Sequence, residues 1–192
     1  MKELLLIGGG GHCKSVIDVI EEEGVFTIAG IIDKPSLVGQ TVLEYPVIGS
    51  DEDLKRLVKS FSYALITVGQ IESPDLRSEL FKMVKNTGFI LPSIISPKSY
   101  VSKYSEIGAG TVIMHHALVN SNARVGENCI VNTKTLVEHD ALIGNDCHLS
   151  TGVVVNGGAV VGRGSFIGSN SVTRENVKIP ENSFIKAGSV VR

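Results

Sequence analysis

The stretch VGENCIVNTKTLVEHDALIGNDCHLSTG, residues 125–152, carries an aliphatic residue at every sixth position. The same spacing starts at Ile95 and continues to Val191, and Thr173 is the one member of this series that is not aliphatic. The residue four positions after each of them is small. An α-helix cannot keep such a series on one face, because residues six apart are rotated by about 600° around its axis. The period therefore predicts a solenoid of short strands.

Three such hexads would close one triangular coil of the solenoid. Each hexad supplies one short strand and one corner, the aliphatic residue fills the interior, and the small residue lets the chain turn close to it. Glycine or asparagine often follows the aliphatic residue directly, as at Gly108 and Asn120. We expect these residues to provide the corners with positive φ. Residues 95–192 are thus predicted to form a parallel β-helix of roughly five coils.

Two of the three cysteines fit this prediction as core residues of the solenoid. Cys129 and Cys147 are 18 residues apart, which is one full coil, and both occupy the small inward position. They should therefore stack at about the 4.8 Å spacing of adjacent strands. An odd number of cysteines without a CxxC pair fits neither a disulfide framework nor a common zinc site.

Residues 1–94 alternate between strand and helix patterns. KELLLIG (2–8), FTIAGIID (26–33) and YALITVG (63–69) are typical of buried strands. HCKSVIDVIEEEG (12–24) and SPDLRSELFKMVKNTG (73–88) have helical spacing and end at glycine. This βαβ order predicts a small, Rossmann-like α/β domain with a parallel sheet. The expected fold is therefore an α/β domain at 1–94 followed by a β-helix at 95–192.

Charge and hydropathy exclude two classes of partner. The net charge of −2 and the isoelectric point near 6.2 provide no general field for nucleic acid or an anionic membrane. No apolar run approaches the roughly 20 residues of a membrane span, and the run near Lys2 is too short for a signal peptide. We expect a cytoplasmic protein.

Four consecutive glycines lie between the first expected strand and helix, namely Gly8, Gly9, Gly10 and Gly11. Backbone N–H groups at such a turn, with the positive end of the helix dipole, can hold a phosphate. Asp33 follows the second strand, where dinucleotide folds place a ribose-binding acid. The domain is only about half the usual size of such folds, so a single nucleotide or nucleotide diphosphate fits better. Alternatively the glycines form only a tight turn, and His12 is only a polar residue at the helix start.

The spacing of two histidines predicts an oligomer. His139 and His148 are nine residues apart, which is half of an 18-residue coil. They should leave the solenoid on different sides, so that one site could contain both only if two subunits contribute. A trimer is the simplest closed ring for a three-sided coil.

His139 is the candidate general base, and it lies between Glu138 and Asp140. Imidazole suits proton transfer near neutral pH, and an adjacent carboxylate can fix its tautomer. We favour Asp140 for this role and keep Glu138 as the alternative. Otherwise His139 is a solvated surface residue, as we expect for His115 and His116. No metal site is expected, because three convergent imidazoles are not available from this spacing.

The segments GGGGHCKSVID (8–18), IIDK (31–34) and VNTKTLVEHDALIGNDCHLSTG (131–152) follow one another in this order. Together they resemble the bacterial sugar O-acyltransferase family of sialic acid O-acetyltransferases. They are similar in particular to its relatives that N-acetylate UDP-linked 4-amino-4,6-dideoxy sugars. The resemblance implies a left-handed β-helix and a homotrimer, with acetyl-CoA bound between neighbouring helices.

The resemblance also implies roles for single residues. His139 would be the general base, Asp140 its acidic partner, and Asn132 would lie near the acceptor sugar. His148 and Gly157 would lie near the thioester and pantetheine arm, and Lys186 and Ala187 would complete the CoA site. The UDP-sugar pocket would comprise Gly8, Gly9, Gly10, Gly11, His12, Asp33, Lys34 and Gly69. Two departures are Cys13, where a glycine is common, and the ending IKAGSVVR (185–192), which lacks the usual tail.

The expected function is transfer of acetyl from acetyl-CoA to the 4-amino group of a UDP-linked amino sugar. The amine would attack the thioester directly, and the backbone N–H of Gly157 would hold the oxyanion. Two alternatives remain: O-acetylation of a sialic-acid-type sugar, and a non-catalytic trimer that binds a nucleotide sugar.

Overall fold

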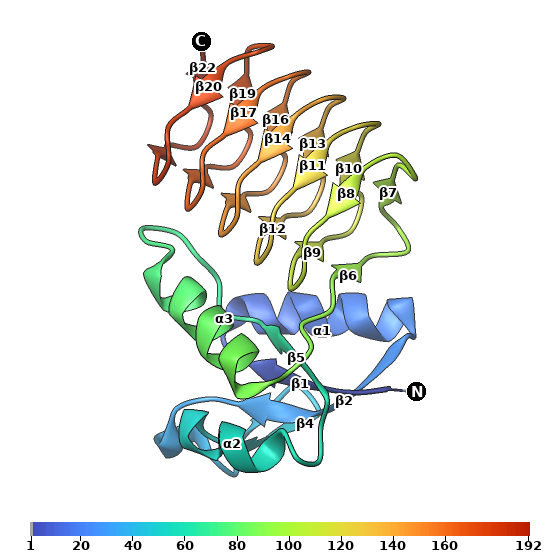
Figure 1. The fold of residues 1–192 in the computed structure, drawn as a ribbon, viewed down its shortest axis with the longest axis vertical. Helices are drawn as coiled ribbons and strands as arrows, with labels where there is room; N and C mark the ends of the chain where they lie inside the picture. The colour runs from blue at the N-terminus through green and yellow to red at the C-terminus, as the bar shows by residue number, and fades with distance from the viewer. Residues whose placement is uncertain (1) are drawn as a thin grey trace. The chain divides into compact units, whose positions relative to one another are not determined.

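A computed structural model describes residues 2–192 (Figure 1). The chain divides into two compact units. One unit comprises the residues up to Gly69 together with Leu76–Pro92, and the other comprises Gln70–Asp75 together with Ser93–Arg192. None of the helices within residues 2–192 has the length and hydropathy that a membrane span requires.

The first unit is an α/β domain around a five-stranded sheet in the order β3-β4-β2-β1-β5. All pairings are parallel except that of β3 with β4. The strands are β1 (Lys2–Ile7), β2 (Phe26–Ile32), β3 (Thr41–Val42), β4 (Tyr45–Gly49) and β5 (Tyr63–Ile66). The helices are α1 (Gly11–Glu23), η1 (Pro35–Leu37), η2 (Asp51–Asp53), α2 (Leu54–Leu57) and α3 (Asp75–Thr87).

The strand and helix predictions for this unit are confirmed at its centre. Leu4, Leu5 and Leu6 of β1 are completely buried, as expected for a parallel strand with both faces covered. α1 ends at Glu23, and the next residue, Gly24, takes a left-handed conformation with φ 66° and donates its N–H to the Ile20 carbonyl over 3.0 Å. A glycine is favoured there because it lacks the Cβ that makes this conformation costly.

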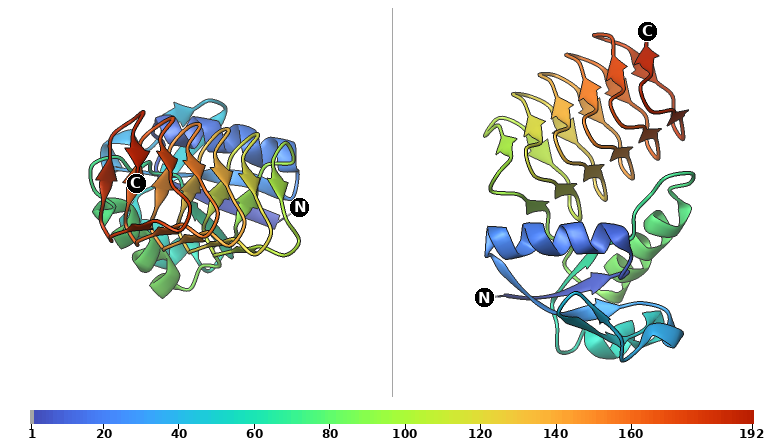
Figure 2. Two further views of the ribbon diagram at one scale, coloured as in Figure 1. Left: turned by 90° about the horizontal axis from the view of Figure 1, so that it is seen from above. Right: turned by 180° about the vertical axis from the view of Figure 1, so that it is seen from behind.

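The second unit is a parallel β-helix, and Figures 1 and 2 show its coils stacked one on another. Seventeen two-residue strands form three parallel sheets, in the orders β22-β19-β16-β13-β10-β7, β20-β17-β14-β11-β8 and β21-β18-β15-β12-β9-β6. Paired residues are 18 apart, as in Leu118 with Leu136. The strands are β6 (Ile94–Ile95), β7 (Tyr100–Val101), β8 (Glu106–Ile107), β9 (Val112–Ile113), β10 (Leu118–Val119), β11 (Arg124–Val125), β12 (Ile130–Val131), β13 (Leu136–Val137), β14 (Leu142–Ile143), β15 (His148–Leu149), β16 (Val154–Val155), β17 (Val160–Val161), β18 (Phe166–Ile167), β19 (Val172–Thr173), β20 (Lys178–Ile179), β21 (Phe184–Ile185) and β22 (Val190–Val191).

The interior of the β-helix contains the residues that the six-residue period selects. Val119, Val137 and Val155, one coil apart, are completely buried. Cys129 and Cys147 are also completely buried. Their thiols donate to carbonyl groups of the next coil, Cys129 to Gly144 over 3.1 Å and Cys147 to Gly162 over 3.2 Å. The interpretation of both cysteines as core residues is confirmed.

The expected reason for the corner glycines was wrong. Positive φ occurs three residues after the aliphatic position, as at Asn122 (60°), Asp140 (62°) and Gly158 (67°), and not at Gly108 or Asn120. The glycines directly after the aliphatic residue serve close approach instead. A Cβ at Gly108 would lie 2.5 Å from the backbone nitrogen of Glu127 in the next coil.

The segment Gln70–Asp75 belongs to the β-helix unit, although it lies within the range 1–94 of the sequence-based division. The Gln70 side-chain amide donates to the Asp146 carbonyl over 2.9 Å. The Gln70 carbonyl lies 2.5 Å from His148 Nδ1. These contacts join residues more than 70 positions apart, and no local sequence pattern indicates them.

Candidate active site

The corner between β13 and β14 contains Glu138, His139 and Asp140. The Nδ1 atom of His139 lies 2.7 Å from Oδ2 of Asp140, and the side chains are 63% and 55% exposed. Because an ionised carboxylate only accepts hydrogen bonds, Nδ1 carries the ring proton and Nε2 is the basic nitrogen. Within residues 2–192, Nε2 has no hydrogen-bond partner. The ring is therefore oriented and accessible, as a general base requires.

Both acids at this corner are held from the preceding coil. Asn122 donates its amide to Asp140 Oδ1 over 2.7 Å, and Asn120 donates to Glu138 Oε2 over 2.7 Å. Glu138 Oε2 also accepts the backbone N–H of His139 over 3.2 Å. Of the two acids, Asp140 is thus the one that contacts the imidazole.

These hydrogen bonds move the pKa values of both members of the pair. The Asn122 amide, followed by the His139 ring, lowers the pKa of the Asp140 carboxyl from its ordinary value. The hydrogen bond that His139 donates to Asp140 raises the pKa of His139, and the charges of Asp140 and Glu138 act in the same direction. The carboxylate therefore stays ionised at neutral pH and stabilises an imidazolium beside it.

Gly157 lies against the ring of His139, one coil later in the β-helix. A Cβ at Gly157 would lie 2.8 Å from Cε1 and 2.9 Å from Nε2 of His139. The backbone N–H of Gly158 donates to the His139 carbonyl over 3.0 Å. The absence of a side chain at Gly157 thus leaves the space that the ring occupies. Its expected role as an oxyanion donor stays a prediction.

His148 and Asn132 form a separate pair. His148 lies on β15 and is only 7% exposed. Its Nε2 is 3.1 Å from the Asn132 amide nitrogen, and its Nδ1 contacts the Gln70 carbonyl. The ring also packs edge to face against Phe166, with centroids 5.2 Å apart. The structure therefore places His148 and Asn132 together and His139 at another corner, and the expected contact of His148 with CoA stays a prediction.

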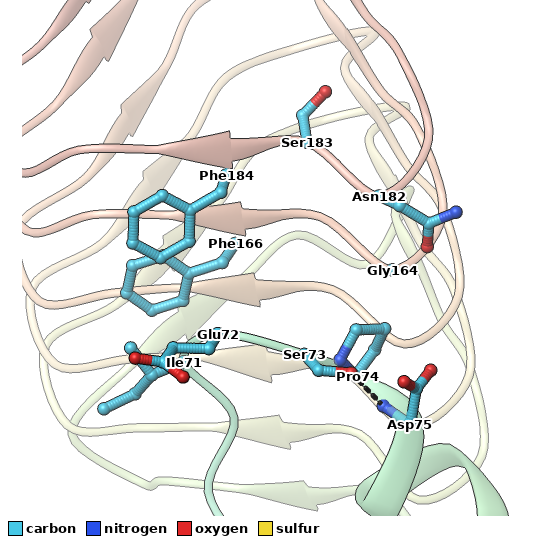
Figure 3. Close-up of a pocket in the computed structure, with 10 residues that line it drawn as sticks. All are labelled: Ile71, Glu72, Ser73, Pro74, Asp75, Gly164, Phe166, Asn182, Ser183 and Phe184. Atoms are coloured by element: carbon cyan, nitrogen blue, oxygen red, sulfur yellow. Dashed lines mark hydrogen bonds between the residues drawn. The ribbon is translucent and has the colours of Figure 1, made fainter.

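A cavity of about 310 Å³ in the β-helix unit is lined in part by Phe166 (Figure 3). Phe166 and Phe184 stack along one side, with ring centroids 5.2 Å apart, and Phe184 is 50% exposed. Figure 3 shows the Ile71–Asp75 segment across from Gly164 and Asn182. This cavity was not predicted from the sequence. Its signal was a pair of phenylalanines one coil apart at an outward strand position.

Lys186 and Ala187, which were expected to complete the CoA site, follow β21 and are exposed.

The glycine-rich turn of the first unit lies between β1 and α1. Gly10 is the residue before the helix, and no side chain caps the first turn. A Cβ added to Gly10 or Gly11 would meet no atom within 4 Å. The backbone N–H of Gly9 donates to Asp33 Oδ2 over 2.6 Å, and that of Lys34 donates to Asp33 Oδ1 over 2.7 Å. The turn therefore presents open backbone at the positive end of the α1 dipole.

The other residues expected in the nucleotide pocket lie around this turn. A Cβ at Gly69 would lie 3.5 Å from the Cβ of His12, so these two residues are adjacent. A cavity of about 130 Å³ is lined by Gly8, Asp33 and Lys34, and also by Asp51. Burial, with a smaller effect from the Asp33 charge, raises the pKa of Asp51. Asp51 was not predicted from the sequence to line this cavity, because it belongs to no recognisable nucleotide-binding motif. Ribose binding by Asp33 stays a prediction.

Among the described residues, no group of three or more His, Cys, Asp or Glu side chains could hold a metal ion. The residues that the structure brings together are thus suited to acid–base chemistry at His139 and to anion binding at the glycine turn.

Two family models match the chain. The model for the PglD N-terminal domain matches residues 3–84, and the model for the bacterial transferase hexapeptide (six repeats) matches residues 140–175. Comparison with curated proteins gives no significant match.

Solved structures resemble the chain over its whole length. A histidine variant of perosamine N-acetyltransferase from Caulobacter crescentus, in complex with CoA and GDP-perosamine, is 30% identical, with a TM-score of 0.93. The match covers 100% of this chain and 89% of that one. The acetyltransferase domain of PglB from Neisseria gonorrhoeae is 28% identical, with a TM-score of 0.90 and coverage of 100% and 92%. WeeI from Acinetobacter baumannii, at 19% identity and a TM-score of 0.75, shares the fold.

The hexapeptide β-helix with its histidine–carboxylate corner defines a bacterial transferase of the hexapeptide class. The chain belongs to the sugar acetyltransferases of this class, those with a PglD-type N-terminal domain. The predicted family is confirmed, and so is the predicted fold class, an α/β domain followed by a left-handed parallel β-helix.

Proposed function

We propose that this chain is an N-acetyltransferase that moves the acetyl group of acetyl-CoA to the 4-amino group of a UDP-linked 4-amino-4,6-dideoxy sugar. The observation that carries the proposal is the His139–Asp140 pair, whose exposed Nε2 is the basic nitrogen. The relatives with CoA and GDP-perosamine bound support the two classes of substrate. Residues 1–94 would bind the nucleotide part, and residues 95–192 would carry out the transfer.

The reaction needs one base and no covalent enzyme intermediate. The acceptor amine attacks the thioester carbonyl carbon, and His139 Nε2 accepts the proton that the amine loses. Collapse of the tetrahedral intermediate expels the CoA thiolate, which then takes the proton from the imidazolium. An amide N–C bond thereby replaces the thioester C–S bond. Asp140 stabilises the imidazolium, and the Gly157 N–H would stabilise the oxyanion.

The glycine turn supports a nucleotide diphosphate in the first unit. The open backbone at Gly10 and Gly11 forms the start of a helix whose first turn contains no acidic residue. Such a helix end favours phosphate without any net positive charge on the protein. The choice of UDP rests on the sequence resemblance, while the related Caulobacter enzyme was crystallised with a GDP-linked sugar.

A thiol-release assay tests the proposal. The protein is given acetyl-CoA with UDP-4-amino sugars, the matching GDP-4-amino sugars, CMP-sialic acid and free sialic acid. We expect rapid CoA release with a UDP-linked amino sugar. Release only with a GDP-linked sugar would contradict the choice of UDP as the nucleotide. Release only with a sialic acid would contradict N-acetylation. No release with any acceptor would contradict the proposed activity.

A further inference from the structure

Asn122 and Asp140 occupy the same corner position in successive coils of the β-helix. They are 18 residues apart, and both take a left-handed conformation, with φ values of 60° and 62°. The next two coils place Gly158 and Asn176 at this position, and another corner of the coils carries Gly152 and Asn170, all with positive φ. The turn itself therefore needs only a residue that tolerates this conformation, and glycine suffices.

Asp140 is held by two donors, one on each carboxylate oxygen. The Asn122 amide donates to Oδ1 and His139 Nδ1 to Oδ2, both over 2.7 Å. The carboxyl group of an aspartate rotates easily about its terminal bond, since that torsion has broad minima. Asp140 is more than half exposed, so packing does not fix this rotation. The hydrogen bond from the Asn122 amide restricts this rotation.

A second asparagine–aspartate pair in the same β-helix has this geometry, and its carboxylate engages a cation. Asn128 donates to Asp146 Oδ1 over 2.8 Å, again one coil apart. The other oxygen of Asp146 accepts from Arg163, at 3.1 Å from Nε and 3.0 Å from Nη2. At Asp140, the imidazole of His139 takes the place of the guanidinium.

We propose that Asn122 is a positioning residue of the acetyl transfer, because its amide holds the Asp140 carboxylate in the orientation that engages His139 Nδ1. The inference rests on the proposed function, in which His139 is the base. Loss of the amide would leave Asp140 free to rotate, and the tautomer and direction of the imidazole would no longer be fixed.

The charged groups around His139 are few, so the effect can be measured. Asp140 and Glu138 flank it at its own corner, and their charges raise its pKa. The coils before and after contribute Ser121 and Asn122, and Gly157 and Gly158, none of which is charged. A change in the pKa of His139 after substitution of Asn122 therefore reports on Asp140.

The test compares Asn122→Gly with Asn170→Gly. Both remove an asparagine from a left-handed corner, at φ values of 60° and 57°, without backbone strain. The pKa of His139 is followed by NMR titration of the ligand-free protein, and kcat/KM is measured against pH. For Asn122→Gly we expect a lower pKa of His139, because its hydrogen bond with Asp140 weakens. The rising limb of kcat/KM should move to lower pH, and kcat/KM should fall roughly tenfold. Asn170→Gly should change neither.

A second variant covers the case in which Asn122→Gly is poorly folded. Asn122→Asp keeps the size of the side chain and its tolerance of positive φ, but it replaces the amide donor to Asp140 with a second carboxylate. Its negative charge would itself raise the pKa of His139, so kcat/KM at the pH optimum is the readout for this variant, and it should fall similarly. An unchanged titration and pH profile in a folded Asn122→Gly variant, or an unchanged kcat/KM in Asn122→Asp, would overturn the inference. The titration needs no substrate. If His139 proved dispensable for transfer, the proposed function would fail while the titration still measured the Asn122 effect.

Discussion

At the scale of the residue, two acids flank His139 in the sequence, and the geometry of the corner selects one. Asp140 takes a left-handed conformation and turns its carboxylate to Nδ1 of His139, whereas Glu138 accepts from Asn120. Sequence neighbours at a tight corner point in directions set by the backbone dihedral angles, which residue spacing does not encode. The sequence therefore identified His139 with its two flanking acids and favoured Asp140, but only the backbone path excludes Glu138 as the partner of the ring.

The role of His139 can be tested by His139→Asn. Loss of a general base typically costs 10²- to 10⁴-fold in rate, and we expect kcat/KM for acetyl transfer to fall within about this range. The side chain is mostly exposed, so the free energy of unfolding should change by no more than about 0.5 kcal/mol.

The matched control is His116→Asn, which removes another exposed histidine at a corner of the β-helix. Its φ of 60° suits asparagine. Turnover by His139→Asn close to that of this control would remove His139 from the role of base.

At the scale of the element, the coils of the β-helix approach one another closely along one corner. Gly108, Gly126, Gly144 and Gly162 are successive members of one column, 18 residues apart. At each of them a Cβ would lie within 3.0 Å of an atom in the next coil, usually a backbone atom. The six-residue period predicted the stacking, but this close contact and the true place of the positive φ follow from the backbone path.

Gly162→Ala should therefore destabilise the protein. The new Cβ would lie 2.4 Å from the Glu181 nitrogen, a backbone atom that cannot move without shifting the coil. Overpacking of this kind typically costs about 1–3 kcal/mol. Chemical denaturation should show a reduced free energy of unfolding.

Gly188→Asn is the control for this substitution. Gly188 takes a left-handed conformation with φ 69°, and no atom lies within 4 Å of the Cβ position. Equal stability of the two variants would show that the coils are less closely packed at Gly162 than the structure indicates.

At the scale of the whole molecule, the structure places the two candidate histidines in separate groups. His139 lies at the corner between β13 and β14, while His148 is buried on β15 with Asn132. If both groups serve one reaction, two chains must contribute different faces to it. The separation of the two groups is the reason to expect a homotrimer with active sites between subunits.

Sedimentation of the active protein tests the homotrimer. We expect a particle of three times the 20.4 kDa chain mass, together with acetyl transfer at the same protein concentration. A monomer with full activity would exclude a site shared between subunits. A stable dimer would contradict the three-fold arrangement.

The sequence by itself determined the β-helix, because a six-residue period fixes which side chains face inward and an 18-residue coil fixes which residues stack. It also determined the glycine turn at Gly8–Gly11 and the candidate base His139. Only the tertiary structure decided that Asp140 engages His139, that Asn122 holds Asp140, and that Gln70 covers His148. These contacts depend on backbone direction at a corner or join residues 18 to 78 positions apart. Local patterning specifies strands and turns, whereas such contacts exist only once the coils have stacked.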